Sequence, residues 1–137
     1  MADCIFCKIV AGQIPATKIY EDDRLLAFLD INPLTRGHCL LIPKAHHENL
    51  MAMPPELLQD LIVAAQKISR AQLKALNALG LNLLQSNGRV ASQIINHFHL
   101  HLLPRYRPDE IGLASWELVP GDKADIAAAA EAVRKAL

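Results

Sequence analysis

The chain has 137 residues, of which 52% are apolar, and its 14 basic residues balance its 14 acidic residues. This length and composition predict a single globular domain over residues 1–137 that closes its own hydrophobic core. The charge balance argues against a nucleic-acid-binding or polybasic membrane-binding surface, and no apolar run reaches the ~18–20 residues that span a bilayer. Three cysteines and a start without a signal-peptide pattern predict a cytoplasmic protein with reduced thiols.

The first elements predicted in chain order are β-strands. Two short runs rich in branched and aromatic residues surround an acidic turn, which favours a hairpin, and a third run ends at Pro43. Two further strands follow in the second half of the chain, joined by a polar turn around Asn87 and Gly88. The predicted strands are residues 17–22, 24–31, 38–43, 81–87 and 97–105.

Two helices are predicted between and after these strands. Leucine, isoleucine and alanine recur at helical spacing over residues 54–78, with a proline in the first turn and Gly80 as a stop signal. The alanine-rich tail after Asp122 predicts a terminal helix that this aspartate caps. Strands that mostly follow one another, with helices inserted, indicate an α+β fold built on an antiparallel sheet.

The segment NHFHLHLLPR holds half of the chain's six histidines, namely His97, His99 and His101. Alternate side chains of a strand point to the same face, so the three imidazoles line one face while the residues between them supply the core. Three solvent-facing polar residues are the plain alternative. A row of imidazoles has further chemistry, because a neutral ring binds metals and attacks electrophiles near neutral pH.

The stretch HFHLHLL resembles the alternating signature of the histidine triad family of nucleotide-binding hydrolases and transferases. The resemblance extends to FLDINP, GHCLLIPKAH and the N-terminal CIFCKIVAGQIP, and covers residues 4–105 in order and spacing. It implies the histidine-triad fold, with a sheet of about five antiparallel strands, one long helix and a C-terminal helix. It also implies a homodimer that pairs through the long helix and an adjoining strand.

This resemblance implies cleavage at the α-phosphate of a purine nucleoside monophosphate derivative, such as a phosphoramidate or a dinucleoside polyphosphate. His99 would attack phosphorus to form a nucleotidyl-histidine that water hydrolyses, while His101 and His38 would neutralise developing charge. Asp30 would hold the ribose hydroxyls, and Asn87 would also reach the nucleotide. Ordinary core packing is the alternative for the residues that would form the base slot, which are Phe6, Ile9, Phe28, Leu29 and Ile31.

The loop before the triad departs from the family pattern. Where family members carry Gly-Gln-Ser or Gly-Gln-Thr, this chain reads Ser92-Gln93-Ile94. The Gln93 amide would still contact the phosphate or the leaving-group bridge, but Ile94 removes a hydroxyl donor and Ser92 removes the backbone freedom of glycine. The alternative function is therefore a nucleotide-binding module with little or no turnover.

The pair Cys4 and Cys7 has the spacing of one half of a tetrahedral zinc site. Resemblance to the bacterial, zinc-containing triad proteins with an N-terminal CxxC implies that His46 and His97 complete it. Four protein ligands leave no open position, so the zinc would be structural and no catalytic metal is expected. Two alternatives stay open at this point: a pair of buried thiols without metal, and a catalytic zinc held by the three triad histidines.

Overall fold

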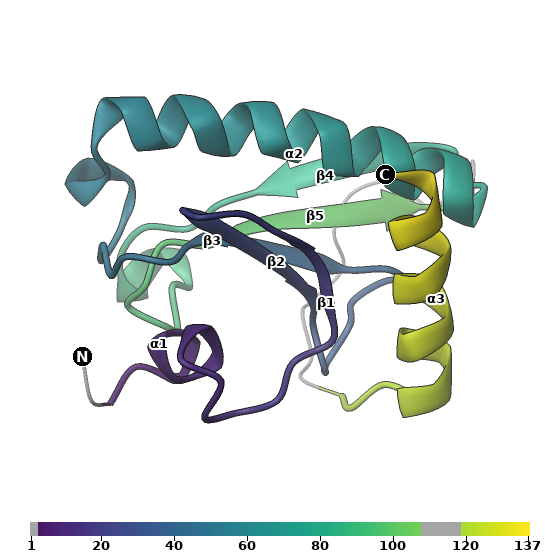
Figure 1. Cartoon of the computed structure of the whole chain (residues 1–137), viewed down its shortest axis with the longest axis horizontal. Helices are drawn as coiled ribbons and strands as arrows, with labels where there is room; N and C mark the ends of the chain where they lie inside the picture. The colour runs from purple at the N-terminus through teal and green to yellow at the C-terminus, as the bar shows by residue number, and fades with distance from the viewer. Residues whose placement is uncertain (1–2, 108–118) are drawn as a thin grey trace.

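The computed structural model describes residues 3–107 and 119–137 and shows one five-stranded antiparallel sheet (Figure 1). The strand order is β1-β2-β3-β5-β4, so β3 and β5 are neighbours although the long helix separates them in the chain. This arrangement confirms the α+β fold. The strands are β1 (Lys18–Glu21), β2 (Leu25–Leu29), β3 (Cys39–Pro43), β4 (Gly80–Leu84) and β5 (Leu100–Arg105).

Helices cover both faces of this sheet. The long helix α2 (Pro55–Leu76) and the terminal helix α3 (Lys123–Ala136) pack against one face, and the short helix α1 (Ile5–Val10) packs against the other (Figure 1). Two single turns of 3₁₀ helix, Leu50–Ala52 and Arg89–Ala91, lie in the loops. None of the described helices is long and apolar enough to cross a membrane.

Strands β2 and β3 are buried along their whole length, because their alternating side chains enter two separate cores. Leu25, Ala27 and Leu29 belong to the large core beneath α2 and α3, whereas Leu26 and Phe28 belong to the smaller core beneath α1. The sheet is therefore the middle of three layers, and α1 defines a separate layer on the face opposite α2.

The predicted element bounds need three corrections. Strand β5 begins at Leu100 and not at His97, because the Phe98 N–H donates at 2.7 Å to the carbonyl of His47, which lies beyond the end of β3. Helix α2 ends at Leu76, where Asn77 adopts a left-handed conformation with φ of 54°. Strand β4 covers Gly80–Leu84, so residues 85–87 lie in the following loop.

Helix α1 was not predicted, since six residues carry little periodic signal. Its N-terminus is stabilised by the Cys4 sulfur, which accepts from the Cys7 N–H at 3.4 Å. The predicted cap of the terminal helix is confirmed, because the Asp122 carboxylate accepts from the Ala124 N–H at 3.0 Å.

Candidate functional site

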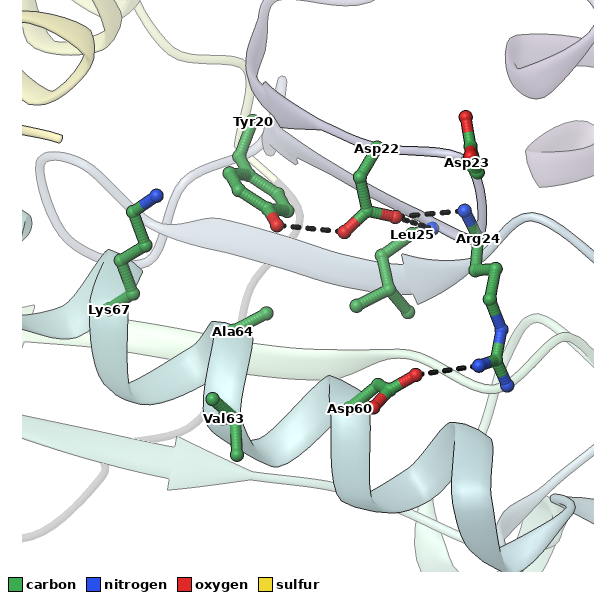
Figure 2. A pocket seen from close by; sticks show the side chains of 9 residues that line it. All are labelled: Tyr20, Asp22, Asp23, Arg24, Leu25, Asp60, Val63, Ala64 and Lys67. Carbon is green, nitrogen blue, oxygen red and sulfur yellow. Dashed lines mark hydrogen bonds and ion pairs between the residues drawn. The ribbon is translucent and has the colours of Figure 1, made fainter.

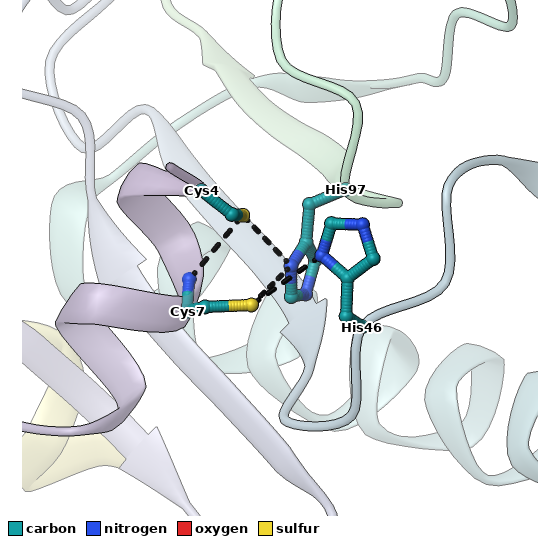
Figure 3. Close-up of side chains that lie close together, drawn as sticks. All are labelled: Cys4, Cys7, His46 and His97. Atoms are coloured by element: carbon teal, nitrogen blue, oxygen red, sulfur yellow. Dashed lines mark hydrogen bonds between the residues drawn. The ribbon is translucent and has the colours of Figure 1, made fainter. Parts of the chain in front are cut away.

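Four metal-binding side chains from separate parts of the chain meet beside α1 (Figure 3). Cys4 and Cys7 lie at the start of this helix, His46 follows β3, and His97 precedes β5. Their donor atoms all lie within 4.8 Å of one another. Cys4 Sγ is 3.3 Å from His97 Nδ1, and Cys7 Sγ is 3.3 Å from His46 Nδ1.

These separations fit a tetrahedral zinc ion. Zn–S and Zn–N bonds of ~2.3 and ~2.0–2.1 Å place neighbouring sulfur and nitrogen ligands about 3.5 Å apart, and Cys7 Sγ is 3.6 Å from His97 Nδ1. The opposite nitrogen of His97, Nε2, donates to the Pro43 carbonyl at 2.8 Å, which leaves the lone pair of Nδ1 directed toward the thiols. Two cysteines and two histidines complete a closed coordination shell, as in structural zinc sites.

The middle histidine of the triad has its tautomer set by the backbone. His99 Nδ1 lies 2.7 Å from the His97 carbonyl oxygen, which only accepts, so Nδ1 carries the proton and Nε2 keeps its lone pair. The side chain is buried, and the His99 ring meets the edges of Phe6 and His101 with centroids 5.2 and 5.0 Å apart. Burial lowers the pKa of His99, which favours the neutral ring.

His101 is held by a deeper histidine, His38. The Leu34 N–H donates to His38 Nδ1 at 3.0 Å, so the proton of His38 is on Nε2, which donates to His101 Nδ1 at 2.9 Å. His101 therefore carries its proton on Nε2. Burial, followed by the charge of His99, lowers the pKa values of both His38 and His101 to about 3, and both rings are neutral near pH 7.

Asp30 lies directly after β2 and beside this pair. Its Oδ2 is 3.7 Å from His38 Nε2, and its Oδ1 accepts from the Asn32 N–H at 2.8 Å. Burial raises the pKa of the Asp30 carboxyl. Asp30, His38 and His101 form a second group of potential metal ligands, but His38 Nε2 and His101 Nδ1 are already bonded to each other.

The three triad rings face three different partners. His97 turns Nδ1 to the cysteines, His99 turns Nδ1 to a backbone carbonyl, and His101 turns Nδ1 to His38. A catalytic zinc on the triad would require one nitrogen from each of the three rings to point to a single ion. The three Nδ1 atoms instead point to different partners. The arrangement instead combines a cluster of two cysteines and two histidines with a neighbouring neutral imidazole.

Comparison with known proteins agrees with this geometry. Residues 11–108 match the sequence profile described as the HIT domain. The chain is 46% identical to Protein hit of Bacillus subtilis over 115 residues, covering 84% of this chain and 79% of that one. It is 39% identical to an adenosine 5′-monophosphoramidase of Schizosaccharomyces pombe over 131 residues, covering 95% of each.

A solved structure described as a Zn-bound histidine triad family protein, from Mycobacterium smegmatis, superimposes with a TM-score of 0.87. It is 39% identical, and the superposition covers 98% of this chain and 93% of that one. The chain belongs to the histidine triad (HIT) family. The five-stranded sheet and helices described above are the fold of this HIT protein, and its cysteine–histidine cluster has the ligand set of a zinc site.

In the loop before the triad of this HIT protein, the Gln93 side chain is hydrogen-bonded to backbone groups. Gln93 Oε1 accepts from the Gly88 N–H at 2.7 Å, and Nε2 donates to the carbonyls of Glu48 and Ile95 at 2.7 and 3.0 Å. Both N–H groups and the oxygen of the amide are thus engaged. A catalytic contact by Gln93 stays a prediction and requires these bonds to open.

The other two residues of the departing motif are also visible in the structure. Ser92 adopts a left-handed conformation with φ of 72°, where the family has glycine, and the Ile94 side chain is 76% exposed. Asn87, expected near the nucleotide, accepts from the Leu50 N–H at 2.8 Å and exchanges hydrogen bonds with Gln85. The Asn87 side chain therefore connects the loop after β4 to the loop that holds Leu50.

The residues expected to line the base slot are divided by the sheet. Phe6, Ile9 and Phe28 lie together in the core beneath α1, and the Phe6 and Phe28 rings meet edge to face with centroids 5.6 Å apart. Ile31 is 71% exposed beyond the end of β2. The prediction for Leu29 needs correction, because strand alternation directs its side chain into the core beneath α2, on the opposite face from Phe28.

A separate groove of about 390 Å³ lies between the β1–β2 turn and α2 (Figure 2). Two pairs of its polar side chains are bonded: Arg24 bonds Asp60 at 2.6 Å, and the Tyr20 hydroxyl donates to Asp22 at 2.7 Å. The Arg24–Asp60 pair joins the hairpin to the helix. The residues that line the groove include none of the six histidines, and neither Cys4, Cys7 nor Asp30.

The sequence did not reveal the backbone groups that set the tautomers of three histidines in the site: His38, His97 and His99. The carbonyls of Pro43 and His97 and the N–H of Leu34 each select one ring nitrogen of a histidine. These groups are present in every residue type, so no sequence signal identifies them.

Proposed function

We propose that this HIT protein is a nucleotide hydrolase or nucleotidyl transferase that cleaves at the α-phosphate through a covalent nucleotidyl-histidine on His99. The observation that carries this proposal is the tautomer of His99, whose Nε2 lone pair is kept available by the bond from Nδ1 to the His97 carbonyl. The similarity to a fission-yeast adenosine 5′-monophosphoramidase along 95% of both chains supports a purine nucleoside phosphoramidate as substrate.

In the first step, the His99 Nε2 lone pair forms a bond to phosphorus, and the bond to the leaving amine or phosphate breaks with its electron pair on the leaving group. A leaving amine takes up a proton from water. The ring becomes cationic as it is nucleotidylated, and the His97 carbonyl that accepts from Nδ1 stabilises this charge. In the second step, water attacks phosphorus and releases a proton, and the bond from phosphorus to Nε2 breaks with its electron pair on the ring, which restores the neutral imidazole.

In this proposal the other residues of the site bind and stabilise the nucleotide. His101, whose Nδ1 accepts from His38, offers Nε2–H to a phosphoryl oxygen and stabilises developing negative charge. Asp30 accepts from the ribose hydroxyls, and Phe6 and Phe28 bound the base slot. Zinc held by Cys4, Cys7, His46 and His97 contributes folding energy and fixes the segment that precedes β5.

A nucleotide-binding module with slow turnover is the second candidate. It is favoured by the exposed Ile94, which provides no hydroxyl donor, and by the Gln93 amide, whose groups are all engaged by backbone. The two candidates share the fold, the slot and the ribose contact. They differ only in whether nucleotide is released from a covalent intermediate.

The test is turnover of adenosine 5′-phosphoramidate, with acid quench and mass spectrometry of the peptide that carries His99. We expect nucleoside monophosphate on that peptide, and we expect His99→Ala to lower turnover at least ~10³-fold while AMP binding persists. His47→Ala is the matched control, because the His47 ring belongs neither to the group of Cys4, Cys7, His46 and His97 nor to the hydrogen-bonded pair of His38 and His101. Turnover above about a tenth of wild type in His99→Ala contradicts the covalent mechanism.

We also propose a homodimer. Strand β4 pairs only with β5 among the described strands, and its Leu83 side chain is 50% exposed. On the neighbouring helix α2, Ile62 and Val63 are 48% and 65% exposed. An open strand edge beside an exposed apolar helix face is suited to a symmetric interface with a second copy.

A further inference from the structure

Pro104 lies inside β5, which is a central strand of the sheet with β3 on one side and β4 on the other. Proline cannot donate to a strand ladder and is usually confined to edges or strand ends. Extending the register of Leu41–Leu100 and Cys39–Leu102 by two residues sets Gly37 opposite Pro104, and a Cβ atom added to Gly37 would lie 3.5 Å from the Pro104 ring. The carbonyl of Gly37 therefore faces a residue that has no N–H.

The alternation of backbone groups confirms this orientation. The Asp30 N–H donates to the His38 carbonyl at 2.9 Å, so the backbone of His38 faces β2. The backbone groups of its neighbours Gly37 and Cys39 then face β5. Without another donor, the Gly37 carbonyl would be buried and unpaired at the point where the ladder stops.

Gln72 supplies that donor from α2. Its Nε2 donates to the Gly37 carbonyl at 3.0 Å and to the Leu102 carbonyl at 3.3 Å, which bridges the two strands. The side chain is fully buried, and Oε1 has no hydrogen-bond partner within the described part of the chain. Burying an unpaired amide oxygen is unfavourable, so packing alone does not explain a glutamine here.

A close approach of α2 makes this bridge possible. Gly37 has φ of 85°, and a side chain at this position would collide with Leu76 of α2. The glycine thus lets the helix lie near enough for a glutamine amide to reach the strand carbonyl. Gly37 directly precedes His38, and Leu102 directly follows His101, so the bridge joins the two backbone segments that carry the histidine pair.

We propose that Gln72 is a positioning residue that replaces the missing ladder donor at Pro104 and thereby holds His38 against His101. The role in turnover rests on the function proposed above, but the geometric effect does not. Without the bridge, the start of β3 separates from β5, the His38–His101 bond of 2.9 Å lengthens, and His101 loses the hydrogen bond that selects its tautomer. Gln72 itself is on the opposite face of the sheet from these rings.

The test is a double-mutant cycle on the full chain with Gln72→Leu and Pro104→Ala. Leucine has a similar volume without a donor, and alanine at position 104 restores the backbone N–H that faces Gly37. We expect Gln72→Leu to lower kcat about tenfold, the scale of a misplaced catalytic group, with little change in KM. We expect Pro104→Ala alone to have little effect, and the double variant to recover most of the loss.

Long-range ¹H–¹⁵N spectra of the imidazole rings give a readout that does not depend on activity. In the wild type and the double variant, His101 should show one tautomer, with the proton on Nε2, whereas Gln72→Leu should show a mixture. A protein that lacks turnover altogether would refute the proposed function and leave this readout intact. An unchanged His101 tautomer in Gln72→Leu, or a double variant no better than Gln72→Leu, would overturn the positioning role. If Gln72→Leu does not fold, the double variant must fold for the proposal to stand.

Discussion

Stability should fall as the pH falls from 7 to 5, in part because His38 is buried as a neutral ring. Its native pKa of about 3 lies well below the ordinary value of 6.5, mainly through burial. Between these two values the unfolded chain binds a proton at this position and the native chain does not, so acidification favours unfolding. The stabilising contribution of the neutral ring is complete above pH 6.5 and is lost as the pH decreases.

The magnitude follows from the two pKa values. From pH 7 to pH 5, protonation of one histidine with an unfolded pKa near 6.5 stabilises the unfolded state by about 2 kcal/mol. That is a large part of the ~5–15 kcal/mol that stabilises a typical domain. His101 shares the low pKa of about 3 and adds a contribution of the same sign.

The perturbation is His38→Asn, which removes the titrating ring while its side-chain oxygen can still accept from the Leu34 N–H. Urea unfolding at pH 7 and pH 5 gives the loss of unfolding free energy for each protein. We expect that loss to be about 2 kcal/mol smaller in the variant than in the wild type. Equal losses in the two proteins would show that His38 does not remain neutral in the native state, and would refute the reasoning.

The purified protein should contain one zinc per chain by elemental analysis, and Cys7→Ser should lower both zinc content and melting temperature, because a closed metal site adds binding energy to folding; metal-free protein prepared without chelators would contradict the site. Ser92→Gly should stabilise the fold by about 1 kcal/mol in thermal unfolding, since φ of 72° is strained for serine. Adding Ile94→Ser to that variant should raise phosphoramidate turnover about 10–100-fold, and no gain would mean that other groups already assist the leaving amine. Sedimentation should show a dimer that Leu83→Lys weakens, whereas a 15.1 kDa species at micromolar concentration would count against the proposed interface.

Much of the fold was predictable because its signals are local. The periodic apolar residues of α2, the cap at Asp122 and the branched residues of β2 and β3 each report their own element. The α1 helix was not predictable in the same way. It has six residues, and its cysteines stabilise it through a cap and a proposed metal site that depend on distant histidines.

The sequence by itself determined the ingredients of the candidate site: alternating histidines, a CxxC pair and an aspartate after an apolar strand. Only the tertiary structure decided how each is used. It directed Leu29 into the opposite core, engaged the Gln93 amide with backbone, and brought the Gln72 amide to the Gly37 carbonyl. The physical reason is that histidine tautomers and strand hydrogen bonds depend largely on backbone groups, which are alike in almost every residue. These groups acquire their partners only when β3 and β5, which the long helix separates in the chain, pair in the sheet.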